Sequence, residues 1–511
     1  MSDTGFHGRH TWETQESFQE VMAEQIKKAP WLMVSIVIHA VLIFLLWNVQ
    51  WEAPRVRFEQ EMAVEQTMED EQPPQEEQEP EEEPEKEEVP ETPEIKDAET
   101  DEQNDEEILD DVPTDAQDDS PFDKDAFNDV IGIGGGAGGH GKFHGRFKRG
   151  GRRGGGKLTE QAVRDALDWL ARHQDDDGKW DTDGFMSHCV GEKCTGPGSP
   201  IHDVGITGLA LLAFLGDGNT LRVGKFKKNV KKGILWLKDQ QDEEGLIGEK
   251  AGQSFMYSHI IAAIAMCEAF GLSRFRLLRR PVQNAINYIS QARNPYKAWR
   301  YYPRSGDNDS SVTGWAVIAL ASAKSFSNMG LKVSEEDFKG AIAWFDEMTD
   351  PNTGRVGYIT RGSPPARPET LMDKFPASKS ESITAVALLA RFFAGQDPKK
   401  YPVMLQHAAL IAKKPPVWNE NDGSIDMYYW YYGSFAMYQV SGNYWRDWNQ
   451  KMKKAVVESQ IHDKKCHRGS WDPVGVWGEE GGRVYSTSLM ALCMEVYYRY
   501  SRLIGARGGS R

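Results

Sequence analysis

The chain has 511 residues, of which only 39% are hydrophobic, a low share for a compact protein of this length. Its net charge of −17 is uneven, because residues 52–130 alone carry about −28 and residues 131–157 about +7. The C-terminal part is close to neutral, which excludes a nucleic-acid-binding domain there. Five cysteines in this length exclude a disulfide-rich scaffold.

An apolar stretch over residues 31–49 (WLMVSIVIHAVLIFLLWNV) is long enough to cross a bilayer. No small-residue cleavage site follows it, so we expect a single transmembrane helix over residues 31–51 rather than a cleaved signal peptide. Lys27 and Lys28 precede it, which favours a cytoplasmic segment over residues 1–30. The chain is therefore expected in the inner membrane, with the bilayer as its partner and its C-terminal domain on the periplasmic side.

His39 is an ionisable side chain at the expected mid-membrane depth, and Ser35 precedes it by one helical turn. The pattern Pro30-Trp31 followed by Ser35-x-x-x-His39 resembles the membrane anchor of TonB-type energy transducers. That resemblance implies that Ser35 and His39 face a proton-channel partner of the ExbB/ExbD kind. An ordinary anchor, in which His39 only snorkels, is the alternative.

Residues 52–130 are rich in Glu, Asp and Pro and too poor in apolar side chains to fold, so a disordered acidic linker is predicted. Residues 131–157 are rich in glycine and basic residues and are expected to form a hinge. An anion-binding role for this basic stretch is the alternative.

From residue 158 to 503 the apolar residues recur with helical spacing, and the second helix of each pair is the more apolar. Six helix pairs are predicted at intervals of roughly 45–65 residues, a period typical of stacked helical units. Such units bury their apolar faces against neighbours, so the array is expected to close or to be capped. The pairs begin near Leu158, Phe226, Pro281, Ser334, Tyr401 and Tyr444.

Two recurring patterns, a Gln-…-Gly-x-Trp turn and an Asp/Ser-…-Thr helix start, resemble the prenyltransferase and squalene-cyclase repeat family. The carriers are Gln174 with Trp180, Gln460 with Trp471, Asp203 with Thr207, Asp309 with Thr313, and Ser382 with Thr384. The resemblance covers nearly all of residues 158–503. It implies an all-α fold, an (α/α)6 toroid with a central cavity, followed by a basic tail over residues 504–511.

In class II terpenoid cyclases of this family, an Asp-x-Asp-Asp motif supplies the catalytic acid. Here Asp307-Asn308-Asp309-Ser310 matches all but the last Asp. The resemblance implies that Asp309 donates a proton and that the charge of Asp307 raises its pKa. The alternative is that Asp309 only caps a helix. The Asp-x-Cys zinc motif of the family's protein prenyltransferases is missing, so no metal and no cofactor are expected.

Several aromatic residues fall near the starts of the inner helices, where they could line the mouth of a central cavity. Such side chains would suit an isoprenoid, a carbocation, a sugar polymer or a peptide. Packing between helices is the alternative for each of them. The candidates are Tyr257, His259, Trp299, Trp315, Trp430, Tyr432 and Tyr485.

Cys189 and Cys194 share one long loop with His188, and His202 follows closely. Outside the cytoplasm we expect these two thiols to form a disulfide. Free thiols and a metal site are the alternatives. Cys466 stands beside a single histidine, which makes too few ligands for a metal.

Two functions fit these features. Because the acid motif is incomplete and no second catalytic group is evident, we expect the toroid to be a binding or scaffold module outside the cytoplasm. Its partner would be an unidentified ligand or protein, and the TonB-like anchor would energise it. The alternative is a cyclase- or lyase-like enzyme that acts on an isoprenoid lipid or a polysaccharide, with Asp309 as general acid.

Overall fold

The structure is a computed structural model that describes residues 38–40, 156–463 and 465–499, the last three of these without their side chains. The chain divides into two units, residues 1–103 and 104–511, and the fold below belongs to the second. Residues 38–40 are helical, and His39 is exposed there. Ser35, the rest of the expected membrane helix, the linker, most of the hinge and the tail lie outside the described residues and stay predictions.

Twelve α-helices follow one another between residues 157 and 499, and the described part of the chain contains two isolated β-bridges but no strand. The first helices of the pairs are α4 (Lys157–Arg172), α6 (Lys227–Asp239), α8 (Arg279–Ala292), α10 (Glu335–Met348), α12 (Val403–Ala412) and α14 (Gly442–Glu458). The second helices are α5 (Asp203–Gly216), α7 (Phe255–Ser273), α9 (Ser310–Lys324), α11 (Ser382–Phe393), α13 (Met427–Val440) and α15 (Gly478–Arg499).

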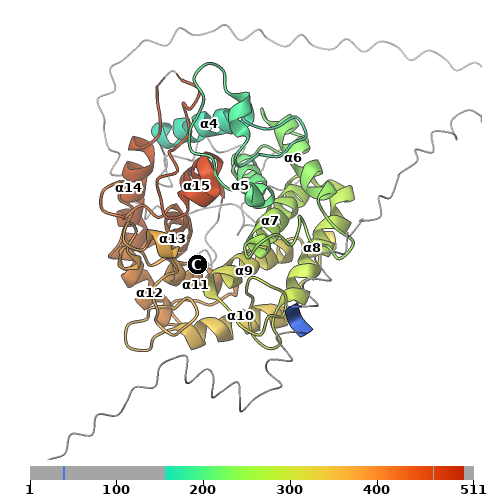
Figure 1. Cartoon of the computed structure of the whole chain (residues 1–511). Helices are drawn as coiled ribbons and strands as arrows, with labels where there is room; N and C mark the ends of the chain where they lie inside the picture. The colour runs from blue at the N-terminus through green and yellow to red at the C-terminus, as the bar shows by residue number, and fades with distance from the viewer. Residues whose placement is uncertain (1–37, 41–155, 464, 500–511) are drawn as a thin grey trace, which may run out of the picture. The chain divides into compact units, whose positions relative to one another are not determined.

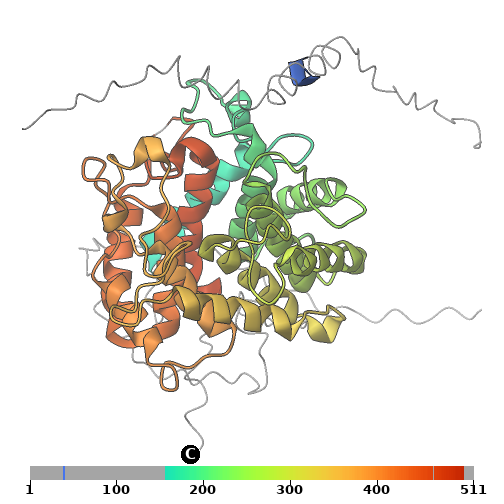
Figure 2. The ribbon, with the colours of Figure 1, turned by 60° about the horizontal axis from the view of Figure 1, so that its bottom comes forward.

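The second helices form a closed inner ring. Each contacts the next in chain order, and α15 contacts α5 to close the ring, with the first helices packed outside (Figure 1). We call the junction between the first and the last repeat the seam. There α4 contacts both α14 and α15, so the red and teal ends of the array lie side by side (Figure 2). The predicted all-α toroid is therefore confirmed for the second unit.

The difference between the two rings follows from the sequence. The outer helix α4 is amphipathic and buries one stripe, which includes Val163, Leu167 and Leu170. The inner helix α7 is apolar all round and nearly all of it is buried. Among the described residues, α7 is the one helix long and apolar enough to cross a membrane, but its burial within the ring marks it as a core helix.

The turns between outer and inner helices repeat one set of hydrogen bonds. The backbone N–H of Trp180 donates to Thr207 Oγ1 of the following inner helix at 2.9 Å, and the Trp180 indole donates to Leu170 O at 2.8 Å. Trp299 and Trp471 repeat this arrangement with Thr313 and Thr487. The recurring tryptophans and threonines of the sequence therefore fix these three turns to their own helix pairs.

Glycines at these turns allow each repeat to dock on the next outer helix. Gly178 has φ +111°, and a Cβ there would lie 2.5 Å from Lys232 O on α6. Gly469 has φ +91°, and a Cβ there would lie 2.2 Å from Asp165 O on α4. The left-handed backbone and the close approach both require glycine. Because Gly469 belongs to the last repeat and Asp165 to the first, this contact helps to close the ring.

Candidate functional site at the start of the inner helix α9

Asp309 lies at the N-cap of α9 with an extended backbone (φ −135°, ψ 156°). Its Oδ1 accepts a hydrogen bond from the Val312 N–H at 2.8 Å, so the helix-cap interpretation is correct for this oxygen. Its Oδ2 is also buried but has no hydrogen-bond partner among the described residues. An unpartnered buried oxygen costs free energy, so capping alone does not account for this side chain.

Burial raises the pKa of Asp309 from 3.8 to about 7. The amides of Val312 and Ser311, the charge of Arg300 and the hydroxyl of Tyr358 oppose this shift without cancelling it. Near neutral pH the carboxyl group therefore exchanges between its protonated and ionised forms.

Asp307 has a different role from the one expected. Its carboxylate is more than half exposed and pairs with Arg300 Nη1 at 2.6 Å. A solvated and paired carboxylate contributes little repulsion to a buried neighbour. The pKa of Asp309 is therefore raised by burial, and the expected like-charge effect of Asp307 is not what the structure shows.

Four tyrosines with part of their surface exposed lie near enough to Asp309 for its charge, besides burial, to raise their pKa values, and we call them with Asp309 the Asp309 cluster. They are Tyr257 of α7, Tyr301, Tyr358 and Tyr428 of α13. The Tyr301 and Tyr358 hydroxyl groups hydrogen-bond to each other, and the hydroxyl groups of Tyr428 and Ser311 are 2.8 Å apart. Burial and then the charge of Asp309 raise the pKa of Tyr257 and of Tyr358, so both phenols stay neutral.

Most of the aromatic residues predicted to line a cavity are instead part of the core. His259, Trp299, Trp430 and Tyr432 are buried. His259 Nδ1 accepts from the Ile247 N–H at 3.0 Å, and burial lowers the pKa of His259 to about 4.

Trp315 is also buried and stacks on Tyr431 with 5.8 Å between ring centroids. Tyr257 and Tyr485 keep part of their surface exposed. Adjacent residues of an inner helix point to different faces, so a start rich in aromatic residues supplies both core and surface side chains.

A surface hollow of about 530 Å³ lies away from the Asp309 cluster, beside α6 and α8. Its lining is polar: Lys238, Gln241, Glu243, Arg280, Pro281 and Asn284. It does not match the aromatic cavity that the sequence predicts, and it brings no candidate acid or nucleophile together with an unpartnered group.

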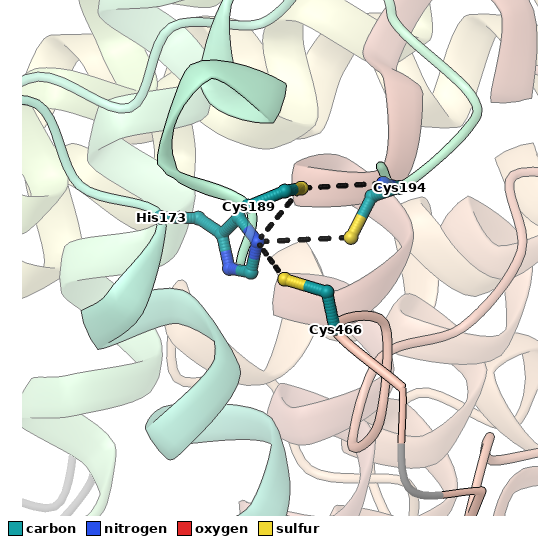
Figure 3. Close-up of side chains that lie close together, drawn as sticks. All are labelled: His173, Cys189, Cys194 and Cys466. Atoms are coloured by element: carbon teal, nitrogen blue, oxygen red, sulfur yellow. Dashed lines mark hydrogen bonds between the residues drawn. The ribbon is translucent and has the colours of Figure 1, made fainter. Parts of the chain in front are cut away.

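Cys189 and Cys194 both carry free thiols, so the expected disulfide is not formed in this structure. Their sulfur atoms lie 3.5 and 3.6 Å from His173 Nε2, and Cys466 Sγ approaches the same nitrogen to 3.4 Å (Figure 3). The two histidines that the sequence suggested point elsewhere: His188 binds Asp175 and His202 binds Glu480.

No known protein family matches the sequence, and no curated protein matches it either. Solved structures do align with it. An inactive variant of an alpha-1,6-mannanase from a Salegentibacter species, in complex with alpha-1,6-mannotriose, aligns at 10% identity and a TM-score of 0.46, over 67% of this chain and 99% of the mannanase. Cellobiose 2-epimerase from Bacillus thermoamylovorans aligns at 13% identity and a TM-score of 0.45, over 67% of this chain and 98% of the epimerase. A type II terpene cyclase from Scytonema aligns at 11% identity and a TM-score of 0.43, over 67% of this chain and 96% of the cyclase.

The expectation of a non-catalytic scaffold is corrected here. The solved structures that align with the toroid include a mannanase, an amylase and an epimerase, which are enzymes. At this level of similarity they do not indicate which reaction or substrate belongs to this chain. The chemistry must be argued from the Asp309 cluster itself.

Proposed function

We propose that this chain is an enzyme in which Asp309 acts as a general acid on a carbohydrate polymer. One observation carries the proposal: Asp309 Oδ2 is buried, has no hydrogen-bond partner among the described residues and belongs to a carboxyl group with a pKa of about 7. A group that is both unpaired and strongly shifted is typical of a catalytic site rather than a structural one.

The pKa fits acid catalysis near neutral pH. A general acid is most effective when its pKa lies near the working pH, because it must be protonated and still give up its proton readily. A buried carboxyl group with a raised pKa is also how glycosidases keep an acid protonated at neutral pH. The burial of Asp309 supplies this property without a neighbouring carboxylate.

The same pKa favours a sugar over an isoprenoid substrate. Protonation of a carbon–carbon double bond needs a much stronger acid than a carboxyl group of pKa about 7. A glycosidic oxygen becomes basic as its bond to carbon breaks, so a weak acid can protonate it in the transition state. The tyrosines support this class, because their rings can stack on sugar faces and their neutral hydroxyl groups can bind sugar hydroxyl groups.

In the proposed step the proton of Asp309 moves to the glycosidic oxygen while the bond from that oxygen to the sugar carbon breaks. Asp309 is left as a carboxylate, held at Oδ1 by the Val312 N–H. Water then forms a new bond to the sugar carbon, and the proton it releases restores the acid form of Asp309. Three other acidic residues at inner-helix starts are ion-paired: Asp203 with Lys179, Glu381 with Arg355 and Lys414, and Asp426 with Arg367. Asp309 is therefore the residue of this set that is suited to give up a proton.

The test is to incubate the purified full-length chain with a panel of polysaccharides and to measure newly formed chain ends. We expect at least one polysaccharide to be cleaved by the wild type and by Asp307→Asn, a matched carboxylate two residues away. Asp309→Asn should lower that rate by about 10²–10⁴-fold. Undiminished cleavage by Asp309→Asn would refute the acid. Conversion of a polyisoprenoid instead of a polysaccharide would keep the acid and refute the substrate class.

A further inference from the structure

Four side chains that have no part in the Asp309 cluster converge on one point. His173 directly follows α4, Cys189 and Cys194 lie in the loop before α5, and Cys466 lies in the loop before α15 (Figure 3). His173 Nε2 lies 3.5, 3.6 and 3.4 Å from the sulfur atoms of Cys189, Cys194 and Cys466, and all four atoms lie within 4.8 Å of one another.

These distances match those of a tetrahedral zinc site. With Zn–N of about 2.0–2.1 Å and Zn–S of about 2.3 Å, a nitrogen and a sulfur ligand lie about 3.6 Å apart. The three observed nitrogen-to-sulfur distances fall close to this value. One imidazole and three thiols are also a ligand set that zinc takes in closed structural sites.

The surroundings of the ligands orient them for a cation. His173 Nδ1 lies 2.8 Å from Trp169 O, which can only accept, so Nδ1 carries the proton and Nε2 turns its lone pair to the sulfurs. The Cys194 N–H donates to Cys189 Sγ at 3.2 Å, a bond that stabilises a thiolate. His173 and Cys194 are buried, which shields the centre from water.

Charge at the site also fits. A zinc ion with three thiolates and one neutral imidazole has a net charge of −1, and binding releases the three thiol protons. Arg172 donates to the carbonyl groups of Cys466 and Arg468, at 3.4 Å each. Arg483, which also pairs with Asp472, donates to Thr195 O at 2.7 Å, next to Cys194. Cationic side chains therefore flank the expected anion.

The four ligands lie on both sides of the seam that closes the ring. His173, Cys189 and Cys194 belong to the first repeat, and Cys466 to the last, 293 residues beyond His173. Other contacts cross the same seam, including Lys465 with Glu192 at 2.8 Å and Gln460 Nε2 with Ala162 O at 2.8 Å. A metal ion here would hold the first and last repeats together, in addition to these polar contacts.

We propose that His173, Cys189, Cys194 and Cys466 bind one zinc ion in a closed structural site that fastens the last repeat to the first. Four protein ligands leave no open position for substrate, so the ion stabilises the ring and takes no part in a reaction. The proposal replaces the expected disulfide, because a bridge between Cys189 and Cys194 would remove two of the ligands.

The test is to measure zinc in the purified full-length chain after dialysis, by elemental analysis. We expect about one zinc per wild-type chain, and at least about tenfold less in Cys466→Ser and in His173→Ala. Cys267→Ser and Cys493→Ser are matched controls, since these thiols lie in the core away from the site, and should keep the full content. Zinc retained by Cys466→Ser would refute the four-ligand site.

A second measurement decides the question if a variant fails to fold. Cobalt exchanged into the wild-type chain should give the visible bands of a tetrahedral centre together with a thiolate-to-cobalt charge-transfer band. Peptide mapping without reductant should find Cys189 and Cys194 as free thiols. A wild-type chain without metal, or a Cys189–Cys194 peptide lighter by two hydrogen atoms, would overturn the proposal.

Discussion

Asp309 and Asp426 occupy the same position in two repeats of the ring. Each is the N-cap of an inner helix, and Oδ1 of each accepts a backbone hydrogen bond, from Val312 at 2.8 Å and from Tyr429 at 3.0 Å. They differ at the second oxygen. Asp426 Oδ2 pairs with Arg367 at 2.9 Å, whereas Asp309 Oδ2 has no partner among the described residues.

Glu381, which directly precedes the inner helix α11, behaves like Asp426. Burial raises the pKa of Glu381, but hydrogen bonds from Arg355 and Lys414 outweigh it and hold the pKa below its ordinary value. Asp426 and Glu381 therefore each have a cationic partner at the start of their inner helix, whereas Asp309 forms no ion pair among the described residues. The repeat pattern accounts for the cap at Asp309, and the unpartnered Oδ2 together with the raised pKa supports the proposed catalytic role.

The largest expected difference is in the pH dependence of catalysis. Because a general acid must be protonated, the rate of polysaccharide cleavage should fall as the pH rises through about 7, the pKa of Asp309. In Asp309→Asn the remaining rate should be about 10²–10⁴-fold lower, and it should no longer show this fall at alkaline pH, the alkaline limb of the pH–rate profile. Rates of the wild type and the variant, measured from about pH 5 to about pH 9, test this; an unchanged limb in the variant would assign it to another group.

The next effect concerns the partner that Asp309 lacks. Arg367→Met leaves Asp426 as a buried carboxylate without its cation, which should lower the free energy of unfolding by about 3–5 kcal/mol. Arg300→Met removes the partner of the exposed Asp307 and should cost about 1 kcal/mol or less. Denaturant titration of both variants measures the difference. Equal losses would mean that the Arg367–Asp426 pair does not have the buried character described.

A third effect is the change with pH in the contribution of Asp309 to the free energy of unfolding. Its folded-state pKa, about 7, lies above its value of 3.8 in the unfolded chain, so the folded state binds more protons between these pH values. The contribution of Asp309 to stability is therefore full below about pH 4 and is lost as the pH rises through about 7, at roughly 1.4 kcal/mol per pKa unit.

Asparagine keeps the cap but cannot ionise, so Asp309→Asn should gain stability relative to the wild type as the pH rises from about 5 to about 8. Thermal unfolding of both proteins at the two pH values tests this. A stability difference that does not change with pH would mean that Asp309 has an ordinary pKa.

The smallest effect is a shift of the alkaline limb. The charge of Arg300 and the hydroxyl of Tyr358 both lower the pKa of Asp309, so Arg300→Met and Tyr358→Phe should each raise it, by about one unit or less. The limb of the pH–rate profile should move upward in both variants. Movement in the opposite direction would show that these groups stabilise the protonated acid.

The helix pairs could be predicted from the sequence, because each inner helix has its own apolar run and three of the turns carry the tryptophan signal, at Trp180, Trp299 and Trp471. Asp309 could be named as a candidate from its acidic neighbourhood. The reason for its raised pKa could not, since burial depends on how α9 packs in the ring. Tyr358 carried no signal because it lies in a loop between α10 and α11.

The proposed metal ligands are harder to predict from the sequence than the acid. The loop holding Cys189 and Cys194 was identified, but the histidines nearest in sequence proved to bind carboxylates. His173 and Cys466 are 293 residues apart, and only closure of the ring brings them together. Local spacing cannot reveal a site that long-range topology creates.

The most direct test of the catalytic account is the protonation state of Asp309 itself. Infrared difference spectra of the wild type minus Asp309→Asn can follow the carboxylic acid C=O band while the pH is raised. We predict that this band disappears with a midpoint near pH 7. The control variant Asp426→Asn, in which Asp309 is unchanged, should show the same band. Loss of the band near pH 4, the ordinary range of an aspartic acid, would contradict the account.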